Sequence, residues 1–247
     1  MTQAVAPTLS TGEQARTADL LRLFPLGYSS VLDIGARDGR FARLLAQCCP
    51  RVVALDLIRP AWTIDGVETV AGDARKLDFP DGSFDIVFCA EVLEHIPGVE
   101  RAAREIARVA KCAALIGVPF EQDIRVGRAT CEQCGRLTPA WGHVNSFTER
   151  RLKSLFPTMK AHQRSFVQGP GWGRTTALGA WLMNLGGNPW HPEGAEGCVH
   201  CGAILTRPTN RARPQRLCSS VALAINRLQE RVTPGRPTWL HVLFVKK

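Results

Sequence analysis

The sequence of 247 residues contains no long hydrophobic run. No segment approaches the roughly 18 to 20 continuous apolar residues that a membrane span needs, so we expect no membrane partner. The segment 1–11 also lacks the basic start and apolar centre of a secretory signal. We therefore expect a cytoplasmic protein.

The chain also lacks an even number of cysteines, since it has nine. An odd number without an export signal disfavours a disulfide framework. Four lie in or beside apolar runs and are predicted to be small core residues: Cys48, Cys49, Cys89 and Cys112. Cys218 receives no assignment.

Acidic residues are scarce in the second half of the chain. Residues 1–120 carry 13 Lys and Arg against 15 Asp and Glu, whereas residues 121–247 carry 18 against 7. The basic half could attract an anionic partner, either a phosphorylated small molecule or RNA, or it could be a solvated surface. Both interpretations stay open.

Apolar strands alternate with helical patterns between residues 29 and 119. This rhythm predicts right-handed crossovers and a mostly parallel sheet, hence an α/β fold. The expected divisions are a helical lead-in at 1–28, a core at 29–120, a continuation with insertions at 121–239 (helix 146–155, strand 160–167), and a final strand at 240–247. Ser146 and Glu149 form a predicted capping box. An Arg-, Pro- and Asn-rich linker is expected at 206–214, followed by a helix at 219–231.

The most informative segment, Val31–Phe41, is a buried strand, a turn with Gly35 and Gly39, and a helix start. Glycines let a backbone approach a nucleotide cofactor, although the complete Gly-x-Gly-x-x-Gly signature is absent. Asp56 ends the next strand, where an acid can accept hydrogen bonds from ribose hydroxyls. Asp73 follows the third strand, where a carboxylate can accept from an adenine amino group.

With the turn Glu91-Val-Leu-Glu-His95, these motifs resemble the class I (Rossmann-like) S-adenosylmethionine-dependent methyltransferases, specifically the small-molecule group with a "VLEH" turn. The resemblance implies a seven-stranded, mostly parallel sheet with helices on both faces and an antiparallel last strand. It implies S-adenosyl-L-methionine as cofactor, with Asp33, Gly35 and Gly39 at the methionine end, Asp56 at the ribose, Asp73 and Ala74 at the adenine, Glu91 near the sulfonium, and Ala36 and Leu57 in the same binding set. The family often has glycine where this chain has Arg37.

Two histidines are candidate catalytic residues. His95 follows the fourth strand, and His143 precedes the predicted helix at 146–155, in a loop where relatives tend to carry a histidine. Either could remove a proton from a hydroxyl or amine acceptor. The alternative for each is a structural role in holding its turn.

Two Cys-x-x-Cys-Gly segments supply four thiolates: Cys131, Cys134, Cys198 and Cys201. This set predicts a closed, structural Zn²⁺ site in a small insertion. A redox pair and an iron–sulfur cluster are the alternatives. The tryptophans of the insertions, Trp141, Trp172, Trp181 and Trp190, could line an acceptor pocket or fill a small core.

We therefore predict an enzyme, a methyltransferase acting on an O or N atom of a small molecule such as a sugar or secondary metabolite, whose acceptor could be anionic. One alternative is an RNA methyltransferase that uses the basic half, although no RNA-binding module is recognisable. Another is a non-catalytic, zinc-stabilised binding protein. The oligomeric state is not predicted.

Overall fold

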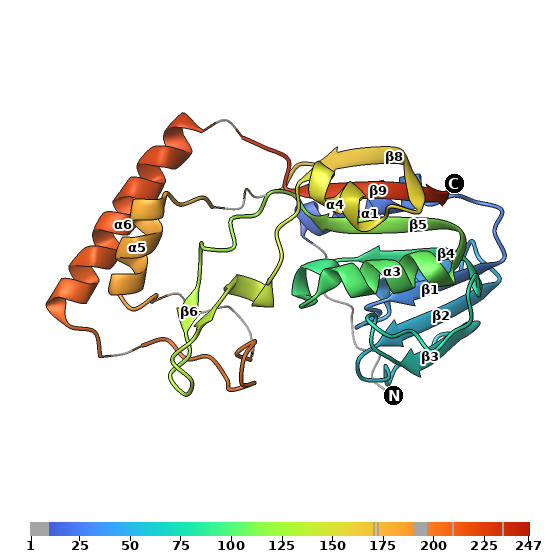
Figure 1. Ribbon diagram of the computed structural model, residues 1–247, viewed down its shortest axis with the longest axis horizontal. Coiled ribbons are helices and arrows are strands. Elements are labelled where there is room, and N and C mark those ends of the chain that lie inside the picture. The colour runs from blue at the N-terminus through green and yellow to red at the C-terminus, as the bar shows by residue number, and fades with distance from the viewer. Residues whose placement is uncertain (1–9, 170, 172, 190–196, 209, 234) are drawn as a thin grey trace.

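A seven-stranded sheet organises the chain (Figure 1). The structure is a computed structural model that describes residues 10–169, 171, 173–189, 197–208, 210–233 and 235–247. The strands are β1 (Ser30–Ile34), β2 (Arg51–Asp56), β3 (Val67–Ala71), β4 (Phe84–Ala90), β5 (Ala110–Pro119), β8 (Met159–Val167) and β9 (Trp239–Lys246). Their order is β3-β2-β1-β4-β5-β9-β8, and β9 runs antiparallel to both of its neighbours. The predicted α/β fold and antiparallel last strand are confirmed.

Helices cover both faces of this sheet. Apolar residues of α3 (Val99–Val109) and α4 (Glu149–Leu155) pack into one buried cluster. Residues of α1 (Thr11–Leu23) and α2 (Arg40–Leu45) pack into a second cluster on the other face. The near-continuous apolar strands are explained by this burial on two sides.

Two polar contacts fix α1 against the sheet. Asp19 Oδ2 lies 2.7 Å from His241 Nδ1 on β9, and Ser165 Oγ on β8 donates to Asp19 Oδ1 at 2.9 Å. Although burial opposes it, the hydrogen bonds from His241, Arg22 and Ser165 hold the pKa of the Asp19 carboxyl well below its usual value. The lead-in helix is therefore part of the core and reaches the carboxyl edge of the sheet.

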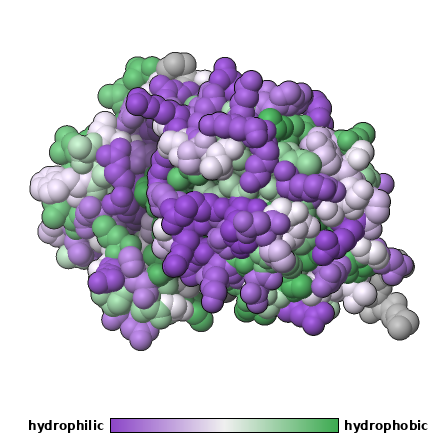
Figure 2. Space-filling model, turned by 45° about the vertical axis from the view of Figure 1, so that its right-hand side comes forward, coloured by the Kyte–Doolittle hydropathy of each residue, from purple (hydrophilic) through white to green (hydrophobic). Residues whose placement is uncertain are grey.

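The insertions contain a two-stranded hairpin and a helix pair. Strands β6 (Ala129–Thr130) and β7 (Leu137–Thr138) form the hairpin, and η2 (Ala140–Gly142) follows it. Helices α5 (Ala177–Leu185) and α6 (Arg213–Val232) pack on each other beyond the end of the sheet (Figure 1). The face seen in Figure 2 is largely hydrophilic, with scattered hydrophobic patches. No helix among the described residues is both long and apolar enough to span a membrane.

Two sequence predictions need correction here. Helix α4 begins at Glu149 with Thr148 as its cap, because the Thr148 hydroxyl accepts from Arg151 N, whereas Ser146 Oγ donates to the Gln122 carbonyl. Helix α6 begins at Arg213, six residues before the predicted start at 219. Pro214 lies in its first turn, where a missing N–H costs no helical hydrogen bond.

Candidate active site and metal centre

The turn after β1 forms the floor of a cleft. Gly35 has φ of +81°, and a Cβ there would lie 2.2 Å from Val92 Cγ2. The amides of Gly35 and Ala36 donate to the Leu55 carbonyl, which ties the turn to β2. Gly39, with φ of +75°, precedes α2 and packs against the Trp62 ring. Glycine is therefore required at position 35 for both conformation and space.

The cleft above this turn has a volume of about 330 Å³. Its lining includes most of the predicted cofactor residues: Gly35, Asp56, Leu57, Asp73, Ala74 and Glu91. Asp56 lies at the end of β2, where its carboxylate accepts from the amides of Arg37 (2.9 Å) and Leu57 (2.7 Å). The Asp73 carboxylate is held by a bidentate ion pair with Arg75, at 2.7 to 3.0 Å.

Asp33 lies beneath the cleft. Its side chain is buried, and its Oδ2 has no hydrogen-bond partner among the described residues. Burial, with the nearby charges of Asp56 and Asp38, raises the pKa of Asp33 to about 7. Neither Asp33 nor Gly39 is among the residues that line the cleft, so the structure gives both a supporting position.

The backbone of Arg37 adopts an unusual conformation. Its φ of +35° lies in the left-handed region that favours glycine. The Arg37 amide donates to Asp56, and its carbonyl accepts from Trp62 Nε1 at 2.8 Å. These two bonds hold an arginine in a conformation that favours glycine, on the rim of the cleft.

A second cleft, of about 480 Å³, adjoins the first, and Gly35, Arg37, Glu91 and His95 line both. It is the candidate acceptor side. The Glu91 backbone has φ of +61°, and its carboxylate lies 3.0 Å from Arg16 Nη1 and 3.9 Å from Arg40 Nη2. Arg16 also stacks on the Trp239 ring at 4.0 Å.

The two arginines beside Glu91 are site residues that the sequence reasoning missed. Arg16 comes from the lead-in helix α1, and Arg40 from the first turn of α2. Their only sequence signal is a basic residue on each of the helices that flank the glycine turn.

Both candidate histidines lie in this second cleft. Their rings meet edge to face, with centroids 4.6 Å apart. His143 Nδ1 is 2.6 Å from Gln122 Oε1. Burial and the neighbouring His95 lower the pKa of His143 to about 3, and burial also lowers the pKa of His95. The two rings are therefore neutral at pH 7.

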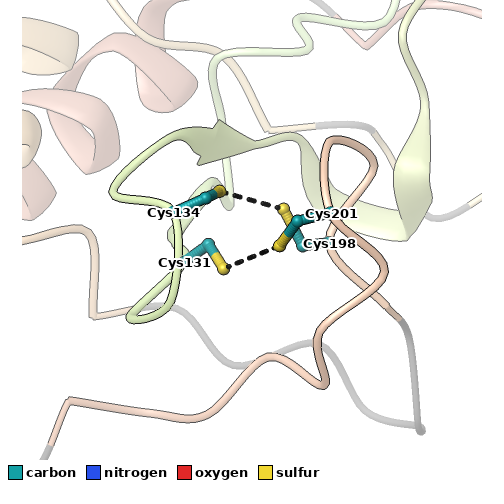
Figure 3. A group of neighbouring side chains, drawn as sticks. All are labelled: Cys131, Cys134, Cys198 and Cys201. Atoms are coloured by element: carbon teal, nitrogen blue, oxygen red, sulfur yellow. Dashed lines mark hydrogen bonds between the residues drawn. The ribbon is translucent and has the colours of Figure 1, made fainter.

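The four predicted metal ligands converge (Figure 3). Cys131 Sγ lies 3.7 Å from Cys201 Sγ, and Cys134 Sγ lies 3.7 Å from Cys198 Sγ. A tetrahedral zinc with Zn–S bonds of about 2.3 Å sets its sulfurs about 3.8 Å apart. The four thiols therefore fit a zinc ion.

Local structure prepares these thiols for metal. Gly135 and Gly202 have φ of +69° and +74°, and their amides donate to the carbonyls of Cys131 and Cys198. Although burial opposes it, hydrogen bonds from Thr138 and the His200 backbone lower the pKa of the Cys198 thiol to about 6. The His200 ring lies against the Leu137 carbonyl and is outside the four-sulfur group.

The tryptophans of the insertions do not all line one pocket. Trp141 lines the second cleft, and Trp181 is 56% exposed on α5. Trp172 and Trp190 lie outside the described residues. Trp239, at the start of β9, lines the cleft and was not predicted.

Comparison with known proteins finds similarity in the core sequence and in the fold. Residues 32–116 match the family described as "Methyltransferase domain". The chain is 16% identical to a solved putative methyltransferase of Bacillus halodurans, with a TM-score of 0.58 over 93% of this chain and 97% of that one. A methyltransferase of Mesorhizobium loti gives 17% identity and a TM-score of 0.55, over 94% and 98%. Residues 32–116 are thus similar to a methyltransferase domain, and the chain shares the fold of these solved methyltransferases.

Curated relatives match only part of the chain. An uncharacterized methyltransferase of Bacillus subtilis is 36% identical over 91 residues, which are 33% of this chain and 36% of the relative. A malonyl-[acyl-carrier protein] O-methyltransferase of Methylococcus capsulatus is 29% identical, over 49% of this chain and 47% of the relative. A ubiquinone biosynthesis O-methyltransferase of Xanthomonas axonopodis is 25% identical, over 67% and 64%. The chain therefore spans less than two thirds of the length of these relatives.

Proposed function

We propose that this chain transfers a methyl group from S-adenosylmethionine to an oxygen or nitrogen atom of a small molecule. The observation that carries the proposal is the pair of adjoining clefts that share Gly35, Arg37, Glu91 and His95. One cleft suits a nucleoside cofactor, and the second opens beside its reactive end. Two of the curated relatives are named as O-methyltransferases, which supports an oxygen acceptor, and the one named for ubiquinone biosynthesis supports a small molecule.

The cofactor cleft fits S-adenosylmethionine. Asp56 would accept from ribose hydroxyls with lone pairs left free by its two amide contacts. Asp73 and Ala74 would hold the adenine, against apolar walls that include Leu55 and Ile96. Gly35 and Ala36 would carry the methionine end, over the buried Asp33. Glu91 would face the positive sulfonium.

The cofactor supplies an electrophilic methyl group when it is bound. The residues of this chain orient the acceptor, because methyl displacement requires the nucleophile, carbon and sulfur in line. Three arginines line the acceptor cleft, Arg16, Arg37 and Arg40, together with four acidic residues, Glu13, Asp38, Glu91 and Glu94. The guanidinium groups offer hydrogen-bond donors to an anionic group of the acceptor.

We also propose a structural Zn²⁺ at Cys131, Cys134, Cys198 and Cys201. It would join the β6–β7 hairpin to residues 198–201, and so fix the loop that carries Trp141 and His143. A site with four cysteines leaves no coordination position open for substrate.

Methyl-labelled S-adenosylmethionine tests the function directly. The purified chain is incubated with it and with a host extract split into small-molecule and RNA fractions. Label in the small-molecule fraction, lost in the Asp56→Ala variant, supports the proposal. Label only in RNA, removed by ribonuclease, would replace it with the RNA alternative.

A further inference from the structure

Two loops that are far apart in sequence are joined beside the second cleft. The Glu94 carbonyl, on η1 (Leu93–His95), accepts from the amides of Val144 (2.8 Å) and Asn145 (3.1 Å). Asn145 Nδ2 in turn donates to the carbonyls of Leu93 and Ile96. These four hydrogen bonds set His143 against His95 and Glu94.

The result is a compact set of metal-ligating atoms. One carboxylate oxygen of Glu94 and one nitrogen each of His95 and His143 all lie within 4.8 Å of one another. All three residues line the second cleft. Two imidazoles and one carboxylate are a ligand set that holds divalent metals with coordination positions left open.

Glu94 is the unusual member of this set. Its exposed fraction is 0%, and neither carboxylate oxygen has a hydrogen-bond partner among the described residues. A buried carboxylate without partners is costly unless it is protonated or meets a cation. The two ring nitrogens beside it add the remaining ligands for a cation.

The histidines are already oriented for metal. The Gln122 amide oxygen can only accept, so His143 Nδ1 carries the hydrogen of their 2.6 Å contact, and Nε2 is the unprotonated nitrogen of the ring. The Gly142 backbone hydrogen-bonds to the His95 ring. Metal-binding histidines usually donate their second nitrogen to a carbonyl or carboxylate in this way.

We propose that Glu94, His95 and His143 bind one divalent cation of the Mg²⁺, Mn²⁺ or Fe²⁺ type at the inner end of the acceptor cleft. This site is distinct from the four cysteines. Three protein ligands leave positions for water and for an oxygen of the acceptor.

The catalytic role of this cation rests on the proposed methyl transfer, whereas its binding does not. A hydroxyl bound to the ion loses its proton to water, because the ion stabilises the alkoxide. The oxygen lone pair then forms the O–C bond, while the C–S bond breaks and its electrons stay on sulfur. The ion would thus promote the loss of the acceptor's proton, so that no histidine would have to act as the base.

Manganese titration tests the site without any assay of activity. Mn²⁺ prefers nitrogen and oxygen ligands over thiolates, so the four cysteines should not compete. The full chain is titrated with MnCl₂, and free Mn²⁺ is followed by its electron paramagnetic resonance signal. We expect about one bound ion per chain. Glu94→Gln should lose at least about tenfold in affinity, and Gln122→Leu about tenfold through the freed His143 ring.

Matched controls separate the site from surface binding and from misfolding. His162→Gln and Glu68→Gln change an exposed histidine and an exposed glutamate, and should bind Mn²⁺ like the parent. Glu94→Asp keeps the charge and should recover part of the affinity. Circular dichroism melting confirms that each variant is folded. Absence of Mn²⁺ binding, or the same affinity in a folded Glu94→Gln variant, would overturn the site and leave Glu94 a protonated core residue.

The two proposals can fail separately. Methyl transfer that is undiminished after metal removal refutes the catalytic role of the ion and leaves the proposed function intact. Mn²⁺ binding that depends on Glu94, in a chain that labels no small molecule, refutes the proposed function and leaves the cation site intact.

Discussion

Replacement of Gly35 by alanine should destabilise the cofactor turn by an amount that can be divided into two parts. The first is conformational, since φ is +81°, and left-handed backbone costs a residue with a Cβ about 1–2 kcal/mol. The second is steric. The new Cβ would lie 2.2 Å from Val92 Cγ2, so the stiff, β-branched valine would have to leave its present rotamer or shift. Overpacking of this kind costs about 1–3 kcal/mol.

Gly66→Ala is the matched control. Its φ is +78°, but no atom lies within 4 Å of the new Cβ. It therefore carries the conformational cost alone, and the free energies of unfolding of the two variants should differ by about 1–3 kcal/mol. Urea unfolding measures this difference directly, and in thermal melts each kcal/mol lowers Tm by about 2–4 °C. Equal destabilisation of the two variants would show that Val92 does not approach the turn as described.

Three further predictions concern the ribose, the cysteines and the buried carboxyl. Asp56→Ala should weaken S-adenosylmethionine binding by about one to two orders of magnitude, because hydrogen bonds to a charged group are each worth about 1.5–3 kcal/mol; calorimetry with unchanged affinity would contradict the ribose assignment. Metal analysis should find about one zinc per chain. Cys198→Ser should lower Tm, whereas Cys218→Ser should not. A metal-free chain, with an unaltered Tm in the Cys198→Ser variant, would refute the proposed structural zinc. The pKa of Asp33 is raised in the folded state to about 7 from 3.8, so the stability it provides is complete below pH 4 and is lost as the pH rises through 7. Asp33→Asn should therefore flatten the fall of Tm between pH 5 and 8, and an identical fall in variant and parent would refute the raised pKa.

The sheet could be predicted from the sequence because its signals are local. Strands such as β2 (Arg51–Asp56) are short, mainly apolar runs bounded by turns, and burial on both faces explains their composition. The antiparallel last strand followed from the resemblance alone. The start of α6 was misplaced because Arg207, Arg211, Arg213 and the adjacent prolines suggest a linker, whereas Pro214 is well tolerated in a first turn.

The candidate sites were predictable to different degrees. The four cysteines could be grouped from their spacing alone, since each pair belongs to one tight turn. Glu94 could not be assigned, because its importance depends on burial and on His143, which is 49 residues away in sequence. Arg16 could not be predicted for the same reason, because only the packing of α1 against the sheet brings its side chain to Glu91.

The backbone of the acceptor cleft shows why such residues escape sequence reasoning. Arg37, Glu91 and Trp141 line this cleft, and all have positive φ without being glycine. A local sequence preference would avoid these conformations, which cost about 1–3 kcal/mol each. Distant contacts maintain them: the Glu91 amide donates to the Gly117 carbonyl on β5, and the Arg37 amide donates to Asp56 on β2. Each side chain is thereby projected into the cleft at an angle that an ordinary backbone would not give, so the fold as a whole, and not the local sequence, determines the shape of the acceptor site.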